Sequence, residues 1–226
     1  MPLYDYSYNL IAENLELFRF FYSMLIAFIC LVVVVKTDRL FKISAHQGIR
    51  YFRNAFFFYG VAFVLRYCLT DIPYFFLVRA VFQFFMIMAG FFLLYSLLWK
   101  KFETNEKNKS SFFNPVIFLF YLITIIIILL DYLWNVYTFM FLSQILLFGL
   151  ASIISCINYK KNGEKHKFLG LYFVIMILSF FAWFLNFVFG NYLGWQLKWL
   201  ANIYALNTIV FLVFLYEVIK LTRKQD

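Results

Sequence analysis

The sequence predicts an all-α, polytopic membrane protein with seven transmembrane helices, its N-terminus outside and its C-terminus inside. Hydrophobic residues make up 65% of the 226 residues and charged residues only 14%, a balance that a surface in water does not tolerate. The hydrophobic residues fall into seven long runs, and the basic residues gather in every second gap between them. Short loops rich in Lys and Arg stay on the cytoplasmic side of a membrane, so this alternation predicts the orientation.

Each run is long enough to cross a bilayer, for which a helix needs about 20 residues. The expected spans are 17–35, 51–70, 74–99, 115–134, 137–158, 168–189 and 198–219. Helices are expected because backbone polar groups in hydrocarbon must be satisfied within their own segment. Segments of alternating polarity, which are typical of a membrane barrel, do not occur in the sequence.

Charged residues, Pro, Gly or Asn bound the spans in chain order. The first follows an acidic segment without a basic n-region, so we expect an uncleaved insertion signal rather than a signal peptide. The boundaries lie at Lys36, Arg50, Asp71, Pro73, Lys100, Pro115, Asn135, Lys160, Lys167, Gly190, Lys198 and Lys220.

The basic residues also limit the classes of partner. Sixteen of the 20 Lys and Arg lie in segments 36–53, 100–109, 160–167 and 220–224. The net charge of +9 therefore follows from membrane insertion, and we expect membrane lipids but no nucleic acid as partners. The expected location is the plasma or cytoplasmic membrane. Four basic residues do not follow the rule: Arg19, Arg66, Arg79 and Lys198.

The chain is expected to form one seven-helix domain, 1–226, with a faint internal repeat. At an offset of 120 residues, FVLRYCLTD from Phe63 to Asp71 aligns with WFLNFVFGN from Trp183 to Asn191. This favours repeat units 17–99 and 137–219, joined by a linker helix at 115–134. Runs of Phe and Leu also align readily by chance, so both interpretations stay open.

With this three-plus-one-plus-three arrangement, the chain loosely resembles the SWEET and PQ-loop transporters and, more distantly, the microbial rhodopsins. The resemblance covers all seven spans but includes no family motif. A Pro-Gln pair is missing from the first and fifth spans, where Ser143 and Gln144 come nearest. The middle of the last span has Asn207 and Thr208 instead of a lysine for retinal. The resemblance therefore implies neither sugar nor retinal, and no cofactor is expected.

Polar residues in the outer halves of the spans are the candidate ligand-binding residues, because charge in the bilayer core is costly and usually functional. They are Arg79, Gln83, Arg66, Gln144, Asn186, Asn202 and Asn207. The guanidinium groups would hold a small anionic or zwitterionic solute, and the amides would orient it. Alternatively, Arg79 pairs with Asp71 or Asp131 to lock helices together, and the asparagines only pack.

Chemistry in the membrane is not expected. His46 and His166 come from separate loops and lack further ligands at zinc spacing, and no catalytic motif of a hydrolase or phosphate loop occurs. We therefore predict a non-enzymatic small-solute transporter. The alternative is a ligand-sensing receptor that signals through a separate cytoplasmic partner, and a lipid-modifying enzyme ranks third.

Overall fold

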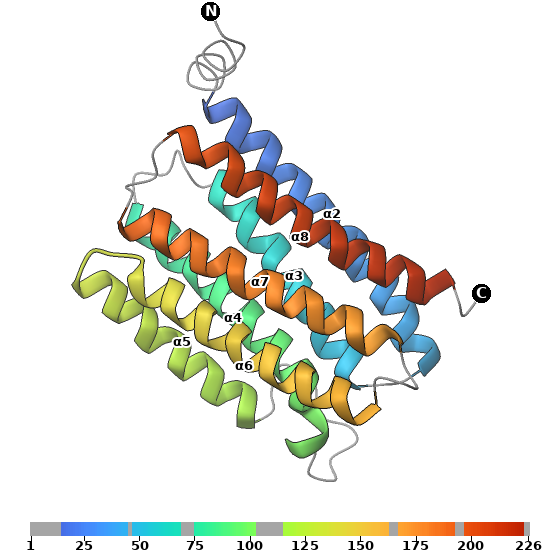
Figure 1. The fold of residues 1–226 in the computed structure, drawn as a ribbon. Helices are drawn as coiled ribbons and strands as arrows, with labels where there is room; N and C mark the ends of the chain where they lie inside the picture. Colours follow the sequence, from blue (N-terminus) through green and yellow to red (C-terminus); the bar gives the residue numbers. More distant parts are fainter. Residues whose placement is uncertain are drawn as a thin grey trace, which may run out of the picture.

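The computed structural model describes residues 15–44, 47–68, 75–102, 115–162, 167–192 and 197–223. These residues form seven α-helices and no strand (Figure 1). The helices are α2 (Leu15–Ser44), α3 (Gln47–Cys68), α4 (Phe75–Phe102), α5 (Pro115–Leu133), α6 (Thr138–Asn162), α7 (Lys167–Asn191) and α8 (Leu197–Arg223). The all-α prediction is confirmed, and each helix overlaps one predicted span.

Six of the seven described helices are long and apolar enough to cross a membrane, and the apolar bundle is that of an integral membrane protein. The seventh helix is α3, which carries Arg50 and Arg53 near its start and Arg66 near its end. These residues shorten its apolar stretch, although its middle is deeply buried, with Ala55, Phe56 and Ala62 inaccessible. The seventh crossing and the orientation stay predictions.

The largest difference from the predicted boundaries is at the end of α2, which continues to Ser44, about two turns past residue 35. The charged residues after residue 35 predict a helix stop there. Asp38 instead pairs with Lys42 one turn later at 3.0 Å, and also with Arg53 of α3. Charged residues at a membrane boundary thus extend the helix and tie its end to the next one.

Six of the described helices form a closed ring. Contacts run from α2 to α3, α4, α6, α7, α8 and back to α2. Helix α5 lies outside the ring against α4 and α6 (Figure 1), and its buried residues are only Ile117, Thr124 and Asp131. Helix α5 corresponds to the span 115–134 that was predicted as the linker helix. Its role as a linker and the duplication stay predictions.

Close contact between α4 and α6 depends on Gly90. Gln144 of α6 donates from Nε2 to the Met86 carbonyl oxygen of α4 at 3.0 Å. A Cβ atom at Gly90 would lie only 2.8 Å from Gln144 Oε1 and 3.0 Å from Leu147 Cδ1. The glycine therefore makes room for an amide that joins the two helices.

We expect Gly90→Ala to lower the free energy of unfolding by about 1–3 kcal/mol, the usual cost of overpacking. The added methyl group would push Gln144 away from the Met86 carbonyl. Thermal unfolding in detergent measures the change. Gly149→Ala is the matched control, because its Cβ would meet Phe180 at an ordinary 3.5 Å. Equal melting temperatures for the two variants would contradict the role of Gly90.

Candidate functional site

A cavity of about 380 Å³ lies inside the ring. Every ring helix contributes to its wall and α5 does not. The lining residues are Arg19, Tyr22, Phe56, Tyr59, Phe63, Arg66, Val78, Arg79, Phe82, Met86, Tyr137, Met140, Phe141, Phe148, Ser179, Ala182, Trp183, Asn186, Tyr204, Asn207, Val210, Phe211 and Phe214. The volume is in the range of small-molecule sites, about 300–1,000 Å³.

Charge is concentrated at one end of the cavity, where α2, α4, α6 and α8 begin. We call this end of the bundle the Arg66 end. Arg19 of α2 and Arg66 of α3 are both exposed there, and the Arg66 guanidinium lies 5.2 Å above the Phe82 ring. Neither arginine forms an ion pair with another residue of the described part of the chain. Both guanidinium groups line this end of the cavity.

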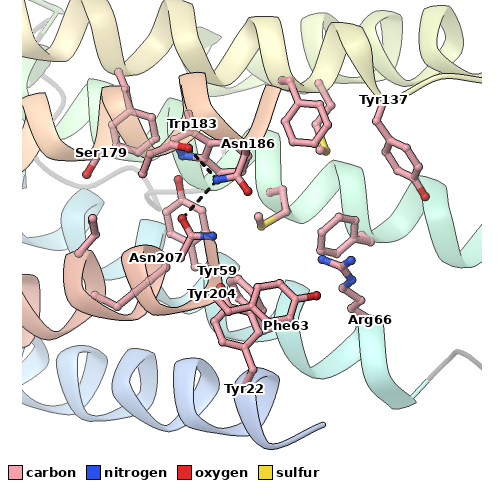
Figure 2. Close-up of a pocket in the computed structure, with 18 of the residues that line it drawn as sticks. Tyr22, Tyr59, Phe63, Arg66, Tyr137, Ser179, Trp183, Asn186, Tyr204 and Asn207 are labelled. Carbon is pink, nitrogen blue, oxygen red and sulfur yellow. Dashed lines mark hydrogen bonds between the residues drawn. The ribbon is translucent and has the colours of Figure 1, made fainter. Parts of the chain in front are cut away.

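The middle of the cavity is crossed by an amide pair between α7 and α8 (Figure 2). Asn186 donates from Nδ2 to the Ala182 carbonyl oxygen at 2.7 Å and to Asn207 Oδ1 at 3.2 Å. Beside the pair, the rings of Tyr22 and Tyr204 stack with centroids 4.1 Å apart. Both asparagines thus have a packing role and also face the cavity.

The far part of the cavity is aromatic, with two hydroxyl groups that lack an acceptor or donor. The Oγ of Ser179 is buried without a hydrogen bond. The hydroxyl of Tyr59 lies beside Trp183 but makes no hydrogen bond of normal geometry. Buried polar groups are rarely left in this state unless a ligand or water satisfies them.

Aromatic side chains pack together on the side of the cavity away from the Arg66 end, where Phe56 and Phe214 line it. Phe214 of α8 packs against Phe56 and Phe52 of α3, with centroids 5.0 and 6.2 Å apart. Tyr172 of α7 lies 6.3 Å from Phe52. We call these four residues the aromatic seal. It joins three of the ring helices at the point where the cavity ends.

Arg79 lines the cavity, but its guanidinium mainly holds the turn between α5 and α6, residues 131–137, which we call the α5–α6 corner. Its Nη1 donates to Asn135 Oδ1 at 2.9 Å. Its Nη2 donates to the carbonyl oxygens of Val136 and, at 3.4 Å, of Asp131. The Tyr137 ring lies 4.0 Å beneath the guanidinium carbon.

The backbone of the α5–α6 corner explains why Arg79 fits there. Asn135 has a φ of 49°, the left-handed conformation that often ends a helix. Its N–H donates to the Tyr132 carbonyl oxygen at 3.1 Å, and the Val136 N–H donates to the Asp131 carbonyl oxygen at 3.0 Å. This pair of bonds is a Schellman motif, and it presents a side-chain and a main-chain oxygen to Arg79.

Asp131 completes the corner by capping α6. Its Oδ1 accepts from the Phe139 N–H at 2.8 Å and its Oδ2 from the Met140 N–H at 2.9 Å. Gln83 of α4 donates to the same Oδ2 at 3.0 Å. The carboxylate is inaccessible to solvent. Asp131 therefore joins α4, α5 and α6. Arg79 contacts the main-chain carbonyl oxygen of Asp131, whereas Gln83 donates to its carboxylate.

The structure divides the seven candidate ligand-binding residues. Arg66, Arg79, Asn186 and Asn207 line the cavity. Gln83 and Gln144 are buried in contacts of α4 with its neighbours, and Asn202 is exposed and is not in the cavity wall. Asp71, His46 and His166 lie outside the described residues. Ligand binding stays a prediction for the four residues that line the cavity.

The aromatic lining and the position of Arg19 in the cavity wall were not predicted from the sequence. With 34 Phe in the chain, no single aromatic residue stands out. A usable signal was the spacing of Tyr204, Asn207, Phe211 and Phe214, which places them on one face of a helix. No group of three His, Cys, Asp or Glu that could hold a metal occurs among the described residues.

Comparison with protein-family models, with curated proteins and with solved structures finds no match for this chain.

Proposed function

We propose that the protein is a transporter that takes a small solute into the ring cavity from the Arg66 end and releases it on the other side of the membrane. The observation that carries this proposal is a cavity walled by all six ring helices, with the aromatic seal packed at one end. Helices that all contact one ligand can all respond to it. Movement of α3, α7 and α8 at the seal would open the second exit.

The proposal includes seven crossings, with the Arg66 end facing outside. Helix α3 has 22 residues and a length of about 33 Å, which is sufficient for a hydrocarbon core of about 30 Å. It also packs against α2 and α4, both apolar enough to cross the membrane. The described parts of the basic segments, residues 36–44, 47–53, 100–102, 160–162, 167 and 220–223, lie at the opposite ends of their helices, which supports a cytoplasmic location for that end.

Uptake by reconstituted vesicles tests the transport proposal without a known substrate. Wild-type vesicles are incubated with a defined mixture of anionic, cationic, zwitterionic and neutral solutes, and their contents are measured by mass spectrometry. We expect at least one solute to accumulate above the level of protein-free vesicles. Ala182→Trp should abolish this uptake, because Ala182 lines the cavity and a Trp would fill it.

The matched control is Phe181→Trp on the same helix, whose side chain is 55% exposed and faces away from the ring. It should retain uptake. If no solute accumulates in wild-type vesicles, the transport proposal is wrong. Saturable binding in detergent together with absent uptake would instead support the receptor, in which the cavity biases an equilibrium read by a separate protein.

A further inference from the structure

From the distribution of polar groups along the cavity, we infer that the ligand is an elongated organic anion. Its carboxylate lies between Arg19 and Arg66, an aromatic or similarly flat body lies among the rings, and a hydroxyl group at the far end meets Tyr59 and Ser179. This inference rests on the proposed function and specifies its class of solute. Figure 2 shows the underlying arrangement, with Arg66 at one end of the cavity, Ser179 at the other and the asparagine pair between them.

The charge of the ligand follows from the mouth of the cavity. Arg19 and Arg66 come from neighbouring helices and line the same cavity, and no described carboxylate neutralises them. Two acidic residues of the described helices lie near this end: Glu16 in the first turn of α2, three residues before Arg19, and Asp131. The carboxylate oxygens of Asp131 are already used by α6 and Gln83. Guanidinium groups bind carboxylates through paired donors, and they repel a cation.

The shape of the body follows from the walls beyond the mouth. Tyr22, Phe63, Tyr204 and Phe211 surround the middle of the cavity, with Trp183 opposite. Tyr22 and Tyr204 stack on each other, and the apolar surface of these aromatic side chains favours a flat apolar group, which packs on aromatic rings at centroid distances of about 4.5–7 Å. A sugar would leave several hydroxyl groups without partners against these rings, at a cost for each.

The length of the ligand follows from the positions of the polar groups on α3. Arg66 and Tyr59 both line the cavity and are seven residues apart, which is about 10 Å along a helix. The buried Ser179 hydroxyl has no hydrogen-bond partner, and the buried Tyr59 hydroxyl lies beside Trp183 without a hydrogen bond of normal geometry. A ligand hydroxyl about 10 Å from the carboxylate would satisfy one or both of them, since each hydroxyl can donate and accept.

A matched set of three probes tests the class. The probe 4-(4-hydroxyphenyl)butanoate has the required charge, ring and length. Its amide removes the charge at nearly constant shape, and 4-phenylbutanoate removes the hydroxyl. Equilibrium dialysis with the purified full-length protein gives the dissociation constants. We expect the amide to bind at least about 10-fold more weakly, as loss of a charge-assisted hydrogen bond predicts, and 4-phenylbutanoate several-fold more weakly.

Variants of Arg66 separate recognition from folding. Arg66→Met should weaken binding of the anion by about 10- to 100-fold while leaving the affinity for the amide unchanged. Arg66→Lys should restore most of the preference for the anion. Arg50→Ala is the control, because Arg50 lies on the same helix at the opposite end and does not line the cavity. Loss of structure would lower the affinity for anion and amide alike.

Equal affinities for the anion and the amide, or no binding of either at millimolar concentration, would overturn the inferred class. If wild-type vesicles nevertheless accumulate another solute, transport stands and only the class is wrong. If the probe binds as expected but does not accumulate, the class stands and transport is wrong. Dialysis repeated with phosphatidylglycerol tests a lipid source: displacement of the probe would show that a lipid headgroup, and not a free carboxylate, occupies the arginines.

Discussion

Asp131→Ala is expected to lower the free energy of unfolding by about 3–5 kcal/mol, the largest effect of any single substitution considered for this chain. The change removes the acceptor of three buried donors: the N–H groups of Phe139 and Met140 and the side-chain amide of Gln83. Each buried donor left without a partner costs about 1–3 kcal/mol, and α6 also loses its cap. Thermal and denaturant unfolding of the purified protein in detergent measure the loss.

Two variants show whether the loss comes from the cap or from the contact with α4. Asp131→Asn retains one acceptor oxygen and should recover about half of the stability lost in Asp131→Ala. Gln83→Met removes only the donor from α4 and should cost about 1 kcal/mol. If Asp131→Ala unfolds like the wild type, water replaces the carboxylate without penalty, and the α5–α6 corner is not a stabilising element.

Most of the architecture could be predicted because it depends on one-dimensional features. A run of about 20 apolar residues must be a helix in a membrane, and the loops around it are marked by charge. The predicted boundaries fail only where charged residues continue a helix, as Asp38 and Lys42 do through their contact at 3.0 Å. Hydropathy cannot distinguish a charged helical turn from a loop.

The neighbours of each helix could not be predicted, and this explains the outcome for the two glutamines. Gln83 and Gln144 are polar residues in apolar helices, which indicates contact with protein rather than lipid. The sequence does not say which helix they contact. Both glutamines contribute to the packing of α4 against α5 and α6. Helix α4 is next to α6 in the ring, and α5 lies outside the ring against both.

Asn186 and Asn207 line the same cavity, whereas their predicted role in ligand binding stays a prediction. Even so, the structure gives them two roles, since they bond to each other at 3.2 Å and also line the cavity. The φ of 49° at Asn135 was not predicted. A single Asn before a new helix has several permitted conformations, and only contact with Arg79 selects this one.

Arg66 and Arg79 are two of the four basic residues that the topology rule does not explain. The structure gives them different surroundings. Arg66 is exposed at the Arg66 end of the cavity, and its guanidinium lies over the aromatic ring of Phe82. Arg79 already donates to oxygens of Asn135, Val136 and Asp131. A guanidinium has only five N–H donors. We therefore assign recognition of the proposed anion mainly to Arg66, whereas Arg79 contacts the α5–α6 corner.

Arg79→Ala should consequently lower the free energy of unfolding by about 2–4 kcal/mol, because the oxygens of the α5–α6 corner lose their donor and Tyr137 loses its cation. Its folded fraction should keep the solute affinity of the wild type within a few-fold. Binding is normalised to the folded fraction, which is measured by size-exclusion chromatography and thermal unfolding.

Asn135→Gly isolates a single contact of this corner. Glycine accepts the positive φ without strain, so the backbone of the corner is kept while the acceptor for Arg79 Nη1 at 2.9 Å is lost. We expect a cost of about 1 kcal/mol and unchanged solute affinity. The reverse pattern for Arg79→Ala, with wild-type stability and no binding or uptake, would make Arg79 a ligand-binding residue. Loss of a group that only stabilises the corner would change the melting temperature, so this result would exclude a purely structural role for Arg79. The carboxylate of the ligand would then be placed between Arg66 and Arg79.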